Sequence, residues 1–233
     1  MAEPDPRDSA GILFRRLAEV IYAQATFDEI YQALCSAAPR LVSGCDRASL
    51  MIADSGRYVT AASSDQIAGQ VDALERQTGQ GPCVDAISDE AAQIVTDLSV
   101  ASPWPAFSEQ VLSVTPVRGA AGFRLIVDDR KVGALNVFSD TPGALTRESA
   151  DQATVLAAFA SVSLSAAAHR ERADSLQRGL ESNREIAKAV GLLMAFYKIS
   201  SEEALGKLRR TSQDLNVKMA EVAREVVQHH DRR

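Results

Sequence analysis

Histidine and cysteine are scarce in this chain of 233 residues, which contains three of each. The cysteines, Cys35, Cys45 and Cys83, are odd in number, widely spaced and without a Cys-x-x-Cys pair. This pattern excludes a disulfide framework and fits a reducing compartment. One histidine falls in a helical region and the other two lie together near the C-terminal end. We therefore expect no catalytic triad, no metal centre and no cofactor.

Long apolar segments are lacking as well. The longest uncharged run, residues 153–168, is rich in alanine and serine, and it is too short and too weakly apolar to span a bilayer. The N-terminal sequence MAEPDPRDSAG is acidic and has no apolar signal core. These observations predict a soluble, cytoplasmic protein without a membrane partner.

The charge of the chain is unevenly distributed. Residues 171–233 contain 12 basic and 10 acidic side chains, whereas the rest of the chain contains 13 basic and 21 acidic ones. A change of sign between two parts of a chain is an argument about partners and not about fold. It favours nucleic acid as the partner of the C-terminal part. The length is sufficient for two domains, each with its own core.

The first part of the chain, residues 10–145, begins with helical patterns. Apolar residues recur at helical spacing over residues 9–24. A second helix is predicted over residues 26–41, where Thr26 precedes Glu29 by three positions, as in a capping box.

The pattern then changes to that of strands joined by turn sequences. Four strands are predicted as two hairpins, which pair residues 47–53 with 58–62 and residues 123–127 with 132–138. Residues 78–116, between the hairpins, are rich in proline and predict an irregular segment. This order of helices and strands indicates an α+β domain with an antiparallel sheet.

From residue 146 the pattern is helical, with Thr146 and Ser149 as capping residues. An apolar seam at spacings of three and four follows, formed by Val155, Phe159, Val162, Ala166, His169, Ala173, Leu176 and Leu180. A sustained heptad seam is what a two-stranded coiled coil requires. We therefore expect a homodimer through a helix over residues 146–182. The alternative is that the first half of this helix packs against its own sheet.

Residues 183–230 predict three short amphipathic helices. Residues 182–183 either break the long helix or continue it. Ser200 and Glu203 form a capping box for the second helix, and Asn216 is a candidate N-cap for the third. The apolar faces comprise Ile186, Ala189, Val190, Leu193, Met194 and Tyr197, then Ala204, Leu205 and Leu208, then Met219, Val222, Ala223, Val226 and Val227. A compact bundle follows if these faces meet.

The order of residues in this bundle resembles the ANTAR domain, an RNA-binding antiterminator module. The positions that carry the resemblance are Arg184, Ile186, Ala189, Gly191, Leu193, Met194, Glu203, Ala204, Leu208, Arg209, Ser212, Asn216, Val222, Ala223, Val226 and Val227. Two positions depart from the family pattern. Val190 replaces a lysine that many relatives carry, and Arg184 lies one residue nearer to Ile186. The resemblance implies binding of paired RNA hairpins whose loops present unstacked bases.

Basic and polar residues of the bundle are the candidate RNA contacts, because cations bind phosphates and polar groups read the base edges of loops. They are Arg184, Lys188, Arg209, Arg210, Ser212, Gln213, Asn216 and Lys218. The alternative is that they are solvated helix ends, with the arginine pair balancing the helix dipole. Ala189 and Gly191 are expected to permit close helix packing. Phe196 or Tyr197 could stack on a base, but at least one is expected to pack in the core.

The preceding region, residues 10–168, resembles the GAF domain found before ANTAR domains in actinobacterial regulators. The segments that carry this resemblance are 78–86, 96–98, 103–107 and 133–139. It implies a sensor domain, with an unknown small molecule as a possible ligand.

Cys83 lies near the pocket region of that family. No neighbouring lysine, arginine or histidine in the sequence would lower its pKa, so a packed residue is expected in place of a reactive thiol. The nearby segment 78–81 lacks the Gly-Lys-Ser/Thr ending of a phosphate-binding loop.

Together these features predict a GAF-like sensor (residues 10–145), a long dimerisation helix (146–182) and an ANTAR domain (183–230). The predicted function is non-enzymatic: binding of RNA hairpins to oppose transcription termination. One alternative is a helix-turn-helix DNA-binding regulator, which the acidic Glu221 and Glu225 of the last helix disfavour. Another is a GAF-fold thiol redox enzyme similar to the free methionine sulfoxide reductases.

Overall fold

The chain divides into a first unit, residues 1–168, and a second unit, residues 169–233. The computed structural model describes residues 11, 15, 18–19, 26–54, 57–88, 92–100, 102–128 and 130–231. The helix predicted over residues 9–24 lies outside the described residues except at four positions. One helix, α6 (Arg147–Tyr197), continues from the first unit into the second. Residues 182–183 therefore continue the long helix. The predicted domain boundaries, between residues 145 and 146 and between residues 182 and 183, stay predictions.

Five antiparallel strands form the sheet of the first unit, in the order β2-β1-β5-β4-β3. They are β1 (Arg47–Asp54), β2 (Arg57–Ser63), β3 (Gln93–Val95), β4 (Gly119–Val127) and β5 (Arg130–Ser139). Both predicted hairpins are confirmed, and the pairing of β1 with β5 joins them. Strand β4 begins earlier than predicted because residues 119–122, Gly-Ala-Ala-Gly, lack the β-branched side chains that mark a strand.

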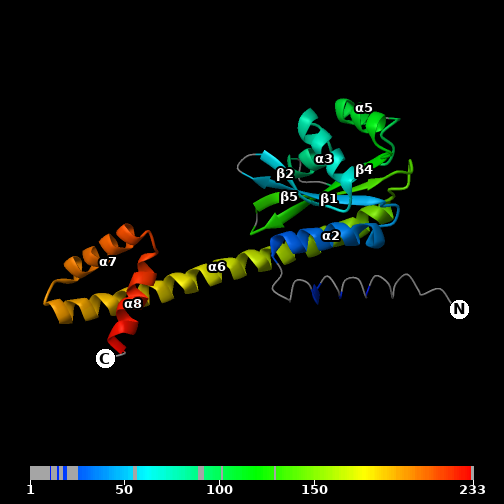
Figure 1. Cartoon of the computed structure of the whole chain (residues 1–233). Helices are drawn as coiled ribbons and strands as arrows, with labels where there is room; N and C mark the ends of the chain where they lie inside the picture. The colour runs from blue at the N-terminus through cyan, green and yellow to red at the C-terminus, as the bar shows by residue number, and fades with distance from the viewer. Residues whose placement is uncertain are drawn as a thin grey trace. The chain divides into compact units, whose positions relative to one another are not determined.

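Helices cover both faces of this sheet (Figure 1). Helix α2 (Phe27–Leu41) and the start of α6 pack on one face, where Leu135 and Val137 of β5 point. Helices α3 (Gln66–Thr78), α4 (Pro82–Ser88) and α5 (Pro105–Val114) lie on the other face, where Ala134 and Phe138 point. The alternation along β5 is that of a strand buried on both sides. The predicted α+β fold class is confirmed.

Three predicted helix starts are also confirmed. Thr26 and Ser200 each accept a hydrogen bond from the backbone N–H of a glutamate three residues on, and each glutamate accepts one from the cap in return. Thr146 makes a similar bond to the backbone N–H of Ser149 at the start of α6, with a distance of 3.4 Å. Local sequence therefore determines where these helices begin.

The segment over residues 78–116 is not irregular as predicted, because it contains α4, β3 and α5. Pro82 and Pro105 stand at the first positions of α4 and α5. A proline at the first helical position lacks only an N–H that would have no partner within the helix. These prolines therefore start helices, although the sequence pattern treats them as loop residues. Helix α3 was not predicted.

Three helices form the second unit: the end of α6, α7 (Ser201–Leu215) and α8 (Met219–Asp231). Figure 1 shows α7 folding back along α6 and α8 crossing it. Their shared core is a cluster of the buried side chains Ala189, Leu208, Val222 and Ala223. The predicted three-helix arrangement is confirmed.

Asn216 has a different role from the one predicted. It ends α7 in the left-handed conformation, with φ of 52°, and its backbone N–H donates to the carbonyl oxygens of Ser212 and Gln213. Helix α8 begins only at Met219, so Asn216 is not its N-cap. Asparagine tolerates this conformation better than most residues, and the same property suits it to helix C-termini.

Helix α6 presents two apolar faces along its first half. Ala153, Leu156, Ala160 and Leu164 are buried against the sheet of the first unit. The predicted dimer seam lies on another face, where Val155, Val162, Leu176 and Leu180 are 58%, 70%, 71% and 71% exposed. The helix is long and apolar enough to cross a membrane by length and composition, but its packing on the sheet accounts for part of that apolar character.

Candidate nucleic-acid interface

The five predicted RNA-contacting cations come from all three helices of the second unit. Arg184 and Lys188 lie on α6, Arg209 and Arg210 lie on α7, and Lys218 directly precedes α8. All five residues are exposed. Each can therefore reach a phosphate without displacing part of the core.

Helical spacing places these residues on several faces. Arg184 and Lys188 are one turn apart and share a face of α6, and Arg209 and Gln213 share a face of α7 in the same way. Lys188 forms an ion pair of 2.7 Å with Glu185, which reduces the positive charge of the α6 pair. The arrangement suits separate contacts along a phosphate backbone more than one concentrated anion site.

Ser212 and Asn216 are engaged in shaping the turn between α7 and α8. The Ser212 hydroxyl donates to the carbonyl oxygen of Val217 at 2.6 Å, and the Val217 N–H donates back to the Ser212 carbonyl at 3.1 Å. Together with the C-cap at Asn216, these bonds satisfy the Ser212 and Gln213 carbonyl groups in the last turn of α7. Both residues thus have a structural role that does not require RNA.

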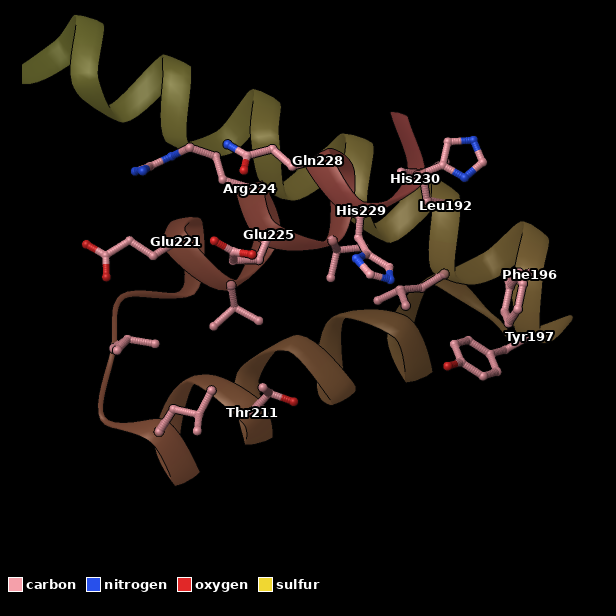
Figure 2. Close-up of a pocket in the computed structure, with 15 residues that line it drawn as sticks. Leu192, Phe196, Tyr197, Thr211, Glu221, Arg224, Glu225, Gln228, His229 and His230 are labelled. Carbon is pink, nitrogen blue, oxygen red and sulfur yellow. The ribbon is translucent and has the colours of Figure 1, made fainter. Parts of the chain in front are cut away.

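An apolar groove of about 920 Å³ opens on another part of the second unit. Figure 2 shows Glu221 and Glu225 of α8 toward one end, Phe196 and Tyr197 of α6 at the other, and His229 between them. Its apolar lining is formed by Leu192, Leu193, Phe196, Tyr197, Leu215, Val217, Val222 and Val226. The fifteen described residues that line it include none of the eight predicted RNA contacts.

Two expectations about residues near α6's end are wrong. Phe196 and Tyr197 are 71% and 55% exposed, so neither packs in the core. A Cβ placed at Gly191 would meet no atom of the described residues within 4 Å, so Gly191 does not serve close helix packing. The bundle is too small to cover this part of α6, whereas Ala189, on the inner face, is fully buried as expected.

Sequence reasoning missed the partner of this aromatic pair. The Lys207 Nζ of α7 lies 5.5 Å from the centre of the Tyr197 ring, within the range of a cation–π contact. Lys207 is separated from Tyr197 by a helix end and a turn. Only the observed return of α7 along α6 brings the two together.

The interior of the first unit holds a cluster of buried acids. The Asp72 carboxylate accepts hydrogen bonds from Ser49 at 2.6 Å, Thr60 at 2.9 Å and Asn136 at 3.2 Å. Even so, burial raises its pKa to about 6. Loss of hydration disfavours the charged form more strongly than these donors favour it.

Glu75 holds helix α4 at its first turn. Its Oε1 accepts the backbone N–H groups of Cys83 at 2.6 Å and Val84 at 3.0 Å, and its Oε2 has no hydrogen-bond partner among the described residues. Burial raises the pKa of Glu75 to about 8, and the neighbouring Asp72 adds to the rise. Gly81 is required here, because a Cβ at that position would overlap the Glu75 carboxyl group.

The three cysteines are buried and unsuited to thiol chemistry. Cys83 packs with Met51 and Ala134, which confirms the prediction of a packed residue. Cys35 and Cys45 belong to the cluster on the opposite face of the sheet. Burial raises the pKa of all three thiols, to about 12 for Cys45, so the reactive thiolate is disfavoured.

Two family models match the chain. One described as a GAF domain matches residues 24–165, more than half of the chain, and one described as an ANTAR domain matches residues 174–227. GAF is a sensor domain and ANTAR is an RNA-binding antitermination domain, so the pair indicates a regulatory protein. No curated protein matches the chain.

Solved structures agree on the fold of the first unit. The phycoerythrobilin-bound GAF domain of a cyanobacterial phytochrome shares 13% identity at a TM-score of 0.52 and covers 73% of this chain and 100% of its own. The Neisseria meningitidis free methionine-R-sulfoxide reductase bound to its substrate shares 18% identity at a TM-score of 0.50, and the match covers 73% of this chain and 96% of the reductase. The Stigmatella aurantiaca phytochrome photosensory core module shares 14% identity at a TM-score of 0.54, and the match covers 89% of this chain and 45% of the module. At these identities the similarity establishes the fold alone.

Proposed function

Because the chain belongs to the GAF domain family and carries an ANTAR domain after its GAF domain, we propose that it is an RNA-binding transcription antitermination regulator. The second unit binds hairpin loops of nascent RNA, and the first unit controls that binding as a sensor. The match to the ANTAR domain over residues 174–227 carries the proposal, since it extends over most of the second unit.

The exposed cations of the second unit supply the affinity in this proposal. Arg184, Lys188, Arg209, Arg210 and Lys218 neutralise phosphates, and Ser212, Gln213 and Asn216 contact bases or sugars of the loop. Holding a hairpin in this way opposes formation of a competing terminator hairpin in the same transcript.

A homodimer through α6 would bring two ANTAR domains to one RNA. The seam from Val155 to Leu180 supports this part of the proposal, because it repeats every seven residues and exposes Val155, Val162, Leu176 and Leu180, although Phe159 also packs partly against the core of the first unit. Two linked bundles that bind two hairpins gain affinity through effective concentration.

The remaining elements follow from the same proposal. Residues 10–145 sense an unknown small molecule, the helix over 146–182 transmits the state of the sensor, and residues 183–230 bind RNA. The protein acts in the cytoplasm, without a cofactor, and RNA and a second copy of the chain are its partners.

RNA binding is tested with the full chain and a pool of RNA hairpins that share a stem and have a randomised loop. We expect binding that weakens steeply with salt, because phosphate contacts release counterions. The double variant Arg209→Ala/Arg210→Ala should lose at least about tenfold in affinity and flatten the salt dependence, since charge-assisted hydrogen bonds are lost.

The matched control is Arg57→Ala/Arg130→Ala, which removes the same charge from exposed positions of the first unit. It should bind RNA like the unchanged protein. Equal affinity for duplex DNA would contradict the proposal and favour the helix-turn-helix alternative, and binding that does not respond to salt would contradict the proposal outright.

The dimer is tested by sedimentation of the full chain at micromolar concentration. Leu176→Lys/Leu180→Lys places charges in the seam and should convert a dimer into a monomer. Val114→Lys, at a position of α5 that is 56% exposed, is the control and should remain dimeric. A monomer in the unchanged protein would rule out this part of the proposal.

A further inference from the structure

The last turn of α6 presents two adjacent aromatic rings to solvent. Phe196 and Tyr197 are 71% and 55% exposed, and their ring centres lie 5.0 Å apart at an interplanar angle of 78°. Figure 2 shows both rings at one end of the apolar groove. Large aromatic side chains normally lose most of their exposed area on folding. A paired set of rings left in water is therefore available for binding another molecule.

A cation is placed beside these rings. Lys207 lies with its Nζ 5.5 Å from the centre of the Tyr197 ring. Lys207, Thr211 and Leu215 follow one another at four-residue spacing, so one stripe of α7 carries this cation and the groove wall. The aromatic end of the groove is thus bordered by positive charge.

The opposite end of the groove has the opposite charge. Glu221 and Glu225 lie there on α8, with Arg224 as one cation beside them, so the side chains at that end have a net negative charge; Figure 2 places all three away from Phe196 and Tyr197. The aromatic end, beside Lys207, is therefore the more favourable side for a polyanion to approach. A neutral, flat group attached to such a polyanion, such as a base, can then enter the groove from the aromatic end.

Polar groups line the groove between its two ends. Gln228, His229 and His230 of α8 supply hydrogen-bond donors and acceptors, and Thr211 supplies a hydroxyl from α7. The apolar core of a protein–protein interface is depleted of charged residues, whereas this groove has charged and polar side chains along much of its lining. Rings, a nearby cation and polar edge groups are the combination that binds unstacked bases of single-stranded RNA.

Resting on the proposed RNA-binding function, we propose that Phe196 and Tyr197, bordered by Lys207, form a stacking platform for an unpaired base of the RNA loop. The base stacks on an exposed ring face at the aromatic end of the groove. Its phosphate lies toward Lys207, and its edge faces the polar side chains of α8. The eight residues predicted from the sequence lie outside this groove, so they contact other parts of the RNA while the platform stacks one base of the loop.

The test uses the full chain and one hairpin selected from the randomised-loop pool. Each loop position is replaced in turn by the fluorescent base 2-aminopurine, whose emission falls when it stacks on an aromatic ring. We expect strong quenching at one loop position on binding. Phe196→Leu and Tyr197→Leu should remove that quenching and weaken binding about five- to a hundredfold, the range found when base-stacking residues are replaced.

Three controls separate stacking from other effects. Val100→Ala changes an apolar residue of the first unit that is 80% exposed and lies outside the groove, and it should bind the hairpin within about twofold of the unchanged protein. Tyr197→Phe should keep both affinity and quenching. An abasic site at the quenched position should weaken binding and make Tyr197→Leu cost nothing further.

The outcomes distinguish this proposal from the function on which it rests. If the unchanged protein binds no hairpin, the proposed function fails and the platform with it. If binding is salt-dependent and is lost in Arg209→Ala/Arg210→Ala but unchanged in Phe196→Leu and Tyr197→Leu, the platform alone is overturned. The platform is also overturned if the ring variants leave RNA binding intact and change only the oligomeric state, because the groove is then a protein interface.

Discussion

The two units of this protein place their polar and apolar side chains in opposite ways. The first unit encloses carboxyl groups, with Asp72 and Glu75 of α3 both fully buried. The second unit buries mostly small apolar side chains in its core and leaves Phe196, Tyr197 and Leu215 more than half exposed. The first unit thus excludes water from ionisable side chains, whereas the second unit leaves large apolar side chains in contact with water.

Size explains part of this difference. A large sheet covered on both faces can exclude water from a carboxylate, while three short helices cannot cover all of their own apolar surface. Stability should therefore be concentrated in the first unit. The following predictions test that contrast.

The largest expected effect comes from removing the same ring type from each unit. Phe138 is fully buried between β5 and the helices of the first unit, so Phe138→Ala should destabilise that unit by about 3–5 kcal/mol. Phe196→Ala should change the stability of the second unit by less than about 0.5 kcal/mol, because Phe196 is 71% exposed.

Trp104, the single tryptophan of the chain, is buried in the same cluster as Phe138 and reports unfolding of the first unit by fluorescence. Hydrogen exchange followed by mass spectrometry reports on the helices of the second unit. Comparable destabilisation by Phe138→Ala and Phe196→Ala would show that the rings of the second unit are part of its core, against the contrast drawn above.

Local signals made much of the fold predictable. The capping boxes at Thr26 and Ser200 depend on two side chains three residues apart, and the hairpins depend on alternation between nearby segments. The ANTAR spacing was likewise visible within a single stretch of sequence, residues 184–227. These features need no knowledge of distant contacts.

Features that depend on tertiary packing were missed. Pro82 starts α4, and Glu75 accepts the N–H groups of that helix only because α3 and α4 meet on the sheet. Periodicity assigned Tyr197 to an apolar face, but it could not show that α7 and α8 leave the end of that face uncovered. The groove and the Lys207 contact were invisible for the same reason.

The buried carboxyl groups of the first unit should give stability a pH dependence opposite in sign to that of the capping glutamate Glu203 in the second unit. Burial raises the pKa of Glu75 from its usual 4.5 to about 8, so the folded first unit binds a proton that the unfolded chain has released. Its stability should therefore fall as pH rises from about 4.5 to about 8, by at most about 1.4 kcal/mol per pH unit for one proton. Urea unfolding monitored by Trp104 at pH 6, 7 and 8 measures this slope.

Glu75→Gln should reduce that slope, since the amide oxygen can still accept the N–H groups of α4 without titrating. In the second unit, the backbone N–H of Ser200 lowers the pKa of Glu203. The stability that the ionised Glu203 contributes is therefore lost as pH falls through its lowered pKa. A slope in the first unit that persists in both Glu75→Gln and Asp72→Asn would refute the assignment to buried carboxyl groups.

The smallest expected effect concerns one glycine in each unit. Gly191→Ala should stabilise the second unit by about 0.5–1 kcal/mol, because alanine is the better helix former and its Cβ meets no atom of the described residues within 4 Å. Gly122→Ala should instead destabilise the first unit by about 1–3 kcal/mol, because its Cβ overlaps the Pro82 carbonyl where α4 lies on β4. Thermal unfolding and hydrogen exchange of the two variants measure these opposite shifts.

If Gly191→Ala also destabilises the second unit, α6 is covered at this position and the second unit is less open than the contrast requires. If it stabilises the helix yet weakens hairpin binding, the bare backbone at Gly191 lies against the RNA, which would extend the interface from Arg184 and Lys188 along the same face of α6.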